Sequence, residues 1–253
     1  MKIAFFDAKP YDIASFDKYA EEYGVAFKYY ETKLNEDTAA LSKGCDGVCV
    51  FVNDRVSPPV IDRLIAEGSK LIALRCAGYN NIDLAYLSGR IPVFHVPAYS
   101  PYSVAEHAMA MLLTSVRRIH KAYIRTRDFN FSLNGMTGFD LHKKTVGIIG
   151  MGRIGRCFAA ICRGFGMRVL AYDKVKDSIF GVTYTDTDTI FRESDVVSLH
   201  CPLTKETYHL VDGEAIGKMK STAILVNTSR GALVDAQALL LAIKERRLGG
   251  CLP

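Results

Sequence analysis

A glycine-rich turn between an apolar run and an amphipathic segment is the stretch of this chain best suited to bind phosphates. The run Val146–Ile149 leads into Gly150, Gly152 and Gly155, which have the spacing G-x-G-x-x-G. In such a turn the first glycine permits the tight bend, the second lets the backbone approach a pyrophosphate, and the third lets the following helix pack close to the strand. The helix N-terminus adds free N–H groups and the positive end of its dipole. The pattern indicates a dinucleotide site, although a tight strand-to-helix turn without a ligand can also carry such glycines.

An acidic residue at the end of the next predicted strand narrows the choice of dinucleotide. The predicted strand Met167–Asp173 ends in a carboxylate eighteen residues after Gly155. A carboxylate at this place accepts hydrogen bonds from the adenosine ribose hydroxyls and repels a 2′-phosphate. The spacing therefore favours NAD over NADP.

The elements that position this site follow from apolar runs that alternate with helical patterns. In the first hundred residues we expect strands at 2–6, 25–30, 47–52, 71–76 and 92–96, and helices at 11–23, 38–42 and 58–66. Apolar strands separated by helices of this length favour a parallel sheet that is covered on both faces. We therefore predict an α/β fold, with residues 1–100 as a first domain.

Residues 101–253 repeat the alternation and predict a second doubly wound parallel sheet, of four or five strands. We expect one long helix over 103–127, a connection over 129–140, strands at 146–149, 167–173, 195–200 and 223–231, and further helices at 187–192, 214–219 and 235–247. The long helix is apolar on one face, so it could span a domain junction or form a dimer surface.

The bulk composition excludes several classes of function. The net charge of +5 is mild and not segregated, so the sequence shows no nucleic-acid footprint. No apolar run approaches the length of a membrane span, and the start of the chain lacks the core of a signal peptide. The seven cysteines have no metal-binding spacing, which predicts reduced thiols in a cytoplasmic protein and no metal site.

A polar loop after the fourth predicted strand is a second candidate binding element. Residues 76–83 carry Gly78 and flanking N–H groups that could bind a small carboxylate as an anion nest, beyond the carboxyl end of a strand. The alternative is an ordinary Gly-Asn turn before a helix that Asp83 caps. Residues 96–102 form a proline-bounded link between the two predicted domains.

Several motifs, taken together and in order, resemble the D-isomer-specific 2-hydroxyacid dehydrogenases. They are Arg75–Asp83, Tyr99–His107, Gly150–Gly155, Leu199–Leu203 and Val226–Gly231. Residues 125–138 resemble the fermentative D-lactate dehydrogenase branch of that family. The resemblance covers nearly the whole chain and implies a flavodoxin-like substrate domain, residues 1–100, followed by a Rossmann NAD-binding domain, residues 101–253, that is incomplete at the C-terminus.

The resemblance implies reversible hydride transfer between NADH and the C2 carbonyl of a 2-oxo acid, with an arginine, a glutamate and a histidine as catalytic residues. Arg230 matches the arginine, and a guanidinium fork is suited to hold a carboxylate and polarise the adjacent carbonyl. Without the surrounding motif, Arg230 would be taken for a surface arginine at a strand end.

The same resemblance assigns the remaining site residues. Backbone N–H groups of Arg153 and Ile154 would face the pyrophosphate, and Asp173 would hold the adenosine ribose. The other residues expected at the cofactor are Cys201, Pro202 and Thr207 near the adenosine half, and Thr228, Ser229 and Arg230 near the nicotinamide. Ala77, Gly78 and Tyr99 match substrate-side positions, although Tyr99 could simply be a packed aromatic residue.

The family's catalytic glutamate and histidine have no counterpart among these 253 residues, because they follow the Gly-Gly turn at which this sequence is about to end. His95, His107 and His200 are expected to be structural or surface residues. We therefore expect a C-terminally truncated chain with impaired pyruvate reduction, an open sheet edge and a homodimeric assembly. Two alternatives stay open, namely a non-catalytic NAD-binding module and a reductase of another 2-oxo acid such as glyoxylate or hydroxypyruvate.

Overall fold

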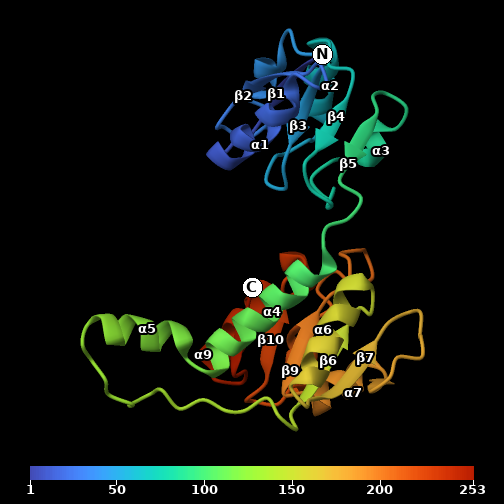
Figure 1. The fold of residues 1–253 in the computed structure, drawn as a ribbon. Helices are drawn as coiled ribbons and strands as arrows, with labels where there is room; N and C mark the ends of the chain where they lie inside the picture. The colour runs from blue at the N-terminus through green and yellow to red at the C-terminus, as the bar shows by residue number, and fades with distance from the viewer. The chain divides into compact units, whose positions relative to one another are not determined.

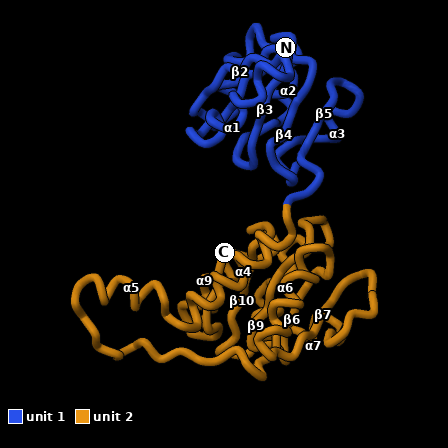
Figure 2. The backbone as a smooth tube through the Cα atoms, in the orientation of Figure 1, with its two compact units in different colours: residues 1–99 blue, residues 100–253 orange.

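The computed structural model describes all 253 residues and divides them into two compact units, Met1–Tyr99 and Ser100–Pro253 (Figures 1 and 2). Each unit is built around one parallel sheet with helices against it, which confirms the expected α/β class with two doubly wound sheets. None of the helices is long and apolar enough to cross a membrane.

The sheet of unit 1 has the strand order β2-β1-β3-β4-β5, the flavodoxin-like order. Its strands are β1 (Lys2–Phe5), β2 (Ala26–Tyr29), β3 (Gly47–Val50), β4 (Ile72–Leu74) and β5 (Val93–His95), all parallel. Its helices are α1 (Pro10–Ala20), η1 (Ala39–Ser42), α2 (Pro58–Ala66) and α3 (Leu84–Leu87). All four residues of β3 are buried, as a central strand covered on both faces requires.

The sheet of unit 2 has six parallel strands in the order β11-β10-β9-β6-β7-β8. The strands are β6 (Thr145–Ile149), β7 (Arg168–Tyr172), β8 (Val182–Tyr184), β9 (Val196–Leu199), β10 (Ile224–Asn227) and β11 (Gly250–Leu252). The chain runs outward from β6 through β7 to β8, then returns to β9 on the other side of β6. Ligands bind at such a reversal in open α/β sheets.

The expectation of four or five strands is wrong, because β8 and β11 were missed. Each has only three residues and pairs on one side only, so neither leaves a clear apolar period in the sequence. Gly249 and Gly250, the residue before β11 and its first residue, were taken only as a helix stop. A Cβ on Gly249 would lie 2.4 Å from the carbonyl oxygen of Thr222, so this glycine lets the backbone approach β10 closely enough to pair.

The prediction of one long helix over 103–127 is also wrong, because this segment forms two helices. α4 (Pro101–Val116) and α5 (Ile119–Arg127) are separated by Arg118, whose φ of 55° is left-handed. The returning chain lies across the end of α4, where a Cβ on Gly138 would be 2.0 Å from the carbonyl oxygen of Val116. The buried face of α4 ends at Val116, and no residue of α5 is buried.

The helices of unit 2 cover both faces of the sheet (Figure 1). α4 and α6 (Arg153–Gly164) bury one face, around Leu112, Ile148 and Phe158. The other face is covered by α7 (Thr187–Glu193), α8 (Gly213–Lys218) and α9 (Ala236–Lys244). A short 3-10 turn, η2 (Gly231–Leu233), follows β10. Two buried faces hold β6 rigidly, and the glycine turn begins where β6 ends.

Candidate cofactor and substrate sites

The predicted cofactor residues of unit 2 follow the carboxyl ends of four neighbouring strands. The glycine turn follows β6, Asp173 follows β7, Cys201 and Pro202 follow β9, and Thr228–Arg230 follows β10. Parallel strands end at the same edge of a sheet, so the fold gathers these segments at one edge, on both sides of the reversal between β6 and β9.

The glycine turn combines two tight contacts with one open position. A Cβ on Gly150, whose φ is +100°, would lie 2.6 Å from the Cys201 backbone nitrogen, and one on Gly155 would lie 2.0 Å from the Gly150 carbonyl oxygen. A Cβ on Gly152 would meet no atom within 4 Å. Two glycines thus let backbone pack on backbone, while the middle one leaves room for a phosphate at the start of α6.

The first N–H groups of α6 face this open position without helical partners. Arg156 donates the first helical hydrogen bond, to the Gly152 carbonyl at 3.0 Å. The N–H groups of Arg153 and Ile154 therefore precede the ladder of the helix and are available to an anion. This geometry fits the pyrophosphate role expected of both residues.

Asp173 also holds the glycine turn, a role that the sequence did not reveal. Its carboxylate accepts hydrogen bonds from the Met151 N–H at 2.6 Å and from the Val175 N–H at 3.1 Å. The Arg156 guanidinium donates to the Met151 carbonyl at 2.9 Å and is paired with Asp177. Met151 and Arg156 were therefore missed as supports of the site. The only sequence signal for these supporting roles was Arg156, directly after Gly155.

The segment after β9 lies against the glycine turn and is fixed by its own hydrogen bonds. The Thr207 hydroxyl donates to the Pro202 carbonyl at 2.7 Å and accepts from the Thr204 N–H at 2.8 Å. Thr207 therefore shapes the turn that carries Cys201 and Pro202. Burial raises the pKa of the Cys201 thiol, so this side chain is a neutral surface rather than a nucleophile.

The loop after β10 is braced from within and carries Arg230 at its end. The Ser229 hydroxyl donates to the Leu199 carbonyl at 2.9 Å, and the Asn227 side-chain amide donates to the Arg230 carbonyl at 2.9 Å. The Arg230 side chain is exposed, with one guanidinium nitrogen 2.9 Å from the Ser229 carbonyl oxygen. The buried Thr228 hydroxyl has no protein hydrogen-bond partner, which fits a place beside a polar ligand.

In unit 1 the structure brings Tyr99 to the loop after β4. The Ala77 N–H donates to the Tyr99 hydroxyl at 2.8 Å, and one ring nitrogen of His95 lies 3.1 Å from the Ala77 carbonyl oxygen. The Cys76 thiol donates to the Gly78 carbonyl at 3.2 Å. These contacts hold the loop at the carboxyl edge of the sheet, where the expected substrate-side residues Ala77, Gly78 and Tyr99 lie together.

The histidine nearest the glycine turn is a packed side chain. One ring nitrogen of His200 lies 2.9 Å from the Ser198 hydroxyl, the other has no partner, and the ring lies against Phe158. Burial lowers the pKa of His200 to about 4, so the imidazole is neutral near pH 7. His95 and His107 are exposed.

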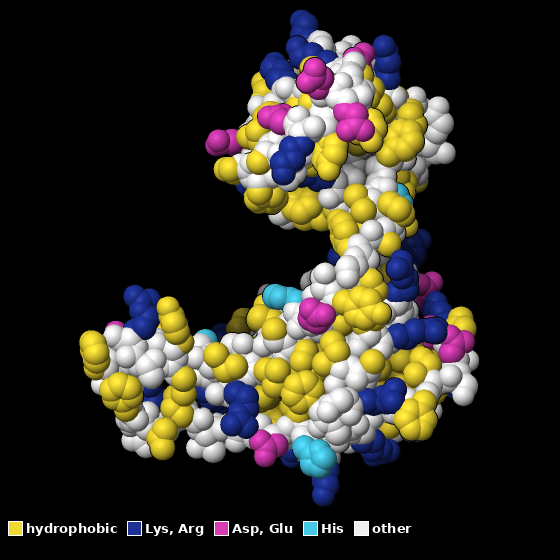
Figure 3. All heavy atoms as spheres, viewed as in Figure 1, with side chains coloured by type: hydrophobic (Ala, Val, Ile, Leu, Met, Phe, Trp, Pro, Cys, Tyr) yellow, Lys and Arg dark blue, Asp and Glu magenta, His cyan; other side chains and the backbone are white.

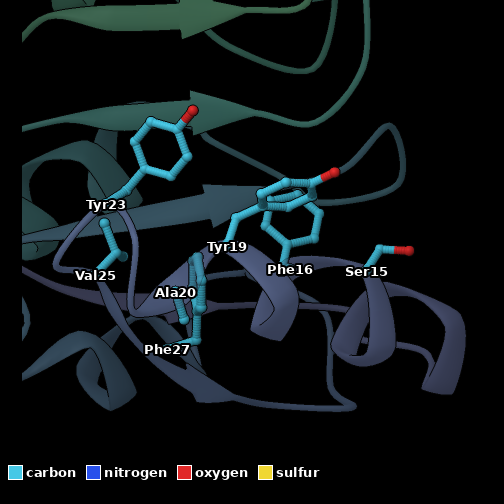
Figure 4. Close-up of a pocket in the computed structure, with 7 residues that line it drawn as sticks. All are labelled: Ser15, Phe16, Tyr19, Ala20, Tyr23, Val25 and Phe27. Atoms are coloured by element: carbon cyan, nitrogen blue, oxygen red, sulfur yellow. The ribbon is translucent and has the colours of Figure 1, made fainter.

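An apolar groove of about 520 Å³ lies elsewhere on unit 1, between α1 and the edge strand β2 (Figure 4). Its lining residues are Ser15, Phe16, Tyr19, Ala20, Tyr23, Val25 and Phe27. None of the predicted site residues is among them, and few polar groups converge there. A small polar substrate therefore has no evident anchor in this groove.

Residues 109–252 match the NAD-binding domain of the D-isomer-specific 2-hydroxyacid dehydrogenases. The D-lactate dehydrogenase of Escherichia coli is 49% identical over 253 residues, which cover 98% of this chain and 77% of that protein. The chain belongs to the D-isomer-specific 2-hydroxyacid dehydrogenase family. A 2-hydroxyacid dehydrogenase homolog of Haemophilus influenzae is 46% identical over 98% of this chain and 76% of its own length.

Solved structures of the family share the fold. The apo-structure of Escherichia coli D-lactate dehydrogenase superposes with a TM-score of 0.92 at 48% identity, over 99% of this chain and 81% of that one. A D-lactate dehydrogenase from Aquifex aeolicus, solved with NAD and lactic acid, gives a TM-score of 0.85 at 37% identity, over 98% and 75% of the two chains. This dehydrogenase is thus an NAD-dependent oxidoreductase by family, with NAD as its cofactor.

Proposed function

We propose that this chain catalyses the reduction of pyruvate to D-lactate by NADH. One observation carries the proposal, namely the order of the site segments along the edge of the unit 2 sheet. Asp173 follows β7, which is next to β6 on one side. The Arg230 loop follows β10, which lies two strands from β6 on the other side, a separation of roughly 10 Å between β6 and β10. A dinucleotide whose pyrophosphate lies on the glycine turn can then direct its adenosine toward Asp173 and its nicotinamide toward Arg230.

Each group has a defined chemical task in this proposal. When bound, NADH would supply the hydride for reduction, and NAD would accept it in the reverse direction. The exposed Arg230 guanidinium holds the substrate carboxylate as a planar fork and polarises the C2 carbonyl as negative charge develops on its oxygen. By the same family resemblance, Ala77, Gly78 and Tyr99 of unit 1 are the proposed substrate-side residues, with the Ala77 N–H held by the Tyr99 hydroxyl. Thr228, Ser229, Cys201 and Pro202 shape the wall along the cofactor.

We also propose that the polypeptide of residues 1–253 by itself binds NADH but turns over slowly. The buried, neutral His200 is packed on Phe158 and is not placed as a proton donor. Losing a positioned general acid costs about 10²- to 10⁴-fold in rate. The buried thiols of Cys45, Cys49 and Cys162 support work in a reducing compartment such as the cytoplasm.

The test is an NADH titration beside an assay of pyruvate reduction. The chain has no tryptophan, so the emission of bound NADH is read without protein background. We expect saturable NADH binding, much weaker NADPH binding, and turnover about 10²- to 10⁴-fold below that of a full-length relative. Asp173→Ser should weaken NADH binding about tenfold and remove most of the discrimination against NADPH.

The outcomes separate the proposed function from its alternatives. Binding of NADH without binding of the pyruvate analogue oxamate would favour a non-catalytic NAD module. Turnover with a bulkier 2-oxo acid rather than pyruvate would favour a sibling reductase. D-2-hydroxyisocaproate dehydrogenase, whose structure matches at 32% identity and a TM-score of 0.81, makes that alternative specific. Turnover of pyruvate at the rate of a full-length relative would contradict slow catalysis by this polypeptide.

We further propose that two copies associate through α5 and the arm of residues 129–140. Hydrophobic side chains gather on this part of unit 2 (Figure 3), namely Ile119, Tyr123, Ile124, Phe129, Phe131 and Leu133, all exposed. Arg125 donates to the carbonyls of Ser132 and Asn134, at 3.1 and 2.6 Å, and so holds the arm beside α5. A gathering of exposed apolar side chains is typical of an interface with a like surface.

Introducing charge on the arm should dissociate the assembly. We expect the parent to sediment as a dimer and the Phe131→Glu/Leu133→Glu variant as a monomer, because two buried carboxylates would meet across the twofold axis. Tyr11→Glu, also at an exposed aromatic residue but on α1, is the matched control and should stay dimeric. A parent that is monomeric at all accessible concentrations would contradict the proposal.

A further inference from the structure

A buried guanidinium lies directly before the substrate-side loop of unit 1. Arg75 follows β4, and its side chain is 7% exposed. Its two terminal nitrogens donate to the carbonyl oxygens of Phe6 and Asp7, at 3.0 and 2.7 Å, just after β1. Its third nitrogen lies 3.5 Å from a carboxylate oxygen of Asp12 in α1. One planar group thus joins the ends of two strands and the start of a helix.

The surroundings of this guanidinium hold it in one orientation. Its central carbon lies 4.5 Å from the ring centre of Phe5 and 4.6 Å from that of Phe51. The Asp12 carboxylate also accepts from the Lys9 N–H at 3.0 Å, so it is fixed at the start of α1. Such a site suits the flat arginine fork and not the single ammonium of lysine.

The loop after Arg75 is tied on its other side to the loop that follows β3. The Asn81 side-chain amide donates to the carbonyls of Phe51 and Asp54, at 2.8 and 2.9 Å. The buried Asp54 carboxylate in turn accepts from the N–H groups of Leu34 and Phe51. Residues 76–80 therefore lie between two anchors, Arg75 on the β1 side and Asn81 on the β3 side, and Tyr99 holds the Ala77 N–H between them.

We propose that Arg75 is a positioning residue that fixes the loop of Ala77 and Gly78, so that the Gly78 N–H is presented to the substrate carboxylate while the Ala77 N–H stays bonded to the Tyr99 hydroxyl. Arg75 does not touch the substrate in this account. It holds the end of β4 against β1 and α1, so the loop leaves the sheet in one direction. A pre-ordered N–H group binds an anion without the cost of ordering the loop. The inference deepens the proposed function and rests on it for the identity of the ligand.

The test compares Arg75→Lys and Arg75→Met with Arg63→Met, a matched control at an exposed arginine of α2. Hydrogen exchange of the free polypeptide should be about tenfold faster or more at residues 76–81 in Arg75→Lys, with β1 and β3 still protected. Oxamate should bind the NADH complex about tenfold more weakly, and NADH affinity should stay within about twofold, because the cofactor residues lie in unit 2. Arg63→Met should match the parent in all three measurements.

A structural role alone gives a different result. If Arg75 only stabilised unit 1, exchange would rise across the whole unit in Arg75→Lys, and the proposal would be overturned. Unchanged exchange at residues 76–81 with unchanged oxamate binding would overturn it as well. If Arg75→Met fails to fold, the lysine variant decides. A parent that binds NADH but no oxamate would count against the proposed substrate, whereas the exchange measurement would still decide the positioning role.

Discussion

Gly155→Ala is expected to abolish measurable NADH binding and to destabilise unit 2. The new Cβ would lie 2.0 Å from the Gly150 carbonyl oxygen, and neither atom belongs to a flexible side chain. α6 must therefore move away from β6, which costs about 1–3 kcal/mol or more in the free energy of unfolding. The same movement displaces the N–H groups of Arg153 and Ile154 from the phosphate position, so we expect NADH affinity to fall more than about 100-fold. Fluorescence titration and urea unfolding followed by circular dichroism measure both effects.

The matched control is Gly164→Ala at the other end of the same helix. A Cβ there would meet no atom within 4 Å. We expect NADH affinity to be unchanged and the free energy of unfolding to rise by about 0.5–1 kcal/mol, because alanine loses less backbone entropy in a helix than glycine. A Gly155→Ala variant that binds NADH as tightly as the parent would show that the turn does not cradle the cofactor.

The stability of unit 2 is expected to fall by about 3 kcal/mol between pH 7 and pH 4 because of His200 alone. Burial lowers the pKa of His200 from 6.5 to about 4. Below pH 6.5 the imidazole of His200 binds a proton in the unfolded chain. In the folded chain it binds that proton only near pH 4. The folded state binds fewer protons in this window, so its stability is complete above pH 6.5 and is lost as the pH falls. Hydrogen exchange of unit 2 peptides in urea, measured at several pH values, follows the loss.

Two variants isolate the contribution of this imidazole. His200→Gln cannot titrate, so its unfolding free energy should vary less with pH by about the same 3 kcal/mol, whatever constant stability the substitution costs. Ser198→Ala removes only the hydroxyl 2.9 Å from the imidazole and should keep the pH dependence of the parent. Parallel pH profiles for His200→Gln and the parent would show that His200 titrates normally in the folded chain.

Much of the architecture could be predicted because it depends on local patterns. Continuous apolar runs predicted the buried strands β3, β6, β9 and β10, and flanking helical patterns predicted the parallel sheets. The errors lie where tertiary contacts override the pattern. Arg118 breaks a periodic helix because Gly138 covers the end of α4, and β8 and β11 exist because neighbouring strands offer them pairing partners.

For the site, local sequence patterns predicted the glycine turn and the acid at the end of β7, and the resemblance to the family predicted the role of Arg230. Spacing along the chain carries this information because each residue acts within its own strand-to-helix turn. The contacts that support these groups are visible only in the folded chain. Three contacts join segments that are far apart in sequence. The Asp173 carboxylate accepts from the Met151 N–H, His200 packs on Phe158, and Arg75 lies between Phe5 and Phe51. Burial and hydrogen bonding between such segments are set by the assembled fold, because no local period records which strands will become neighbours.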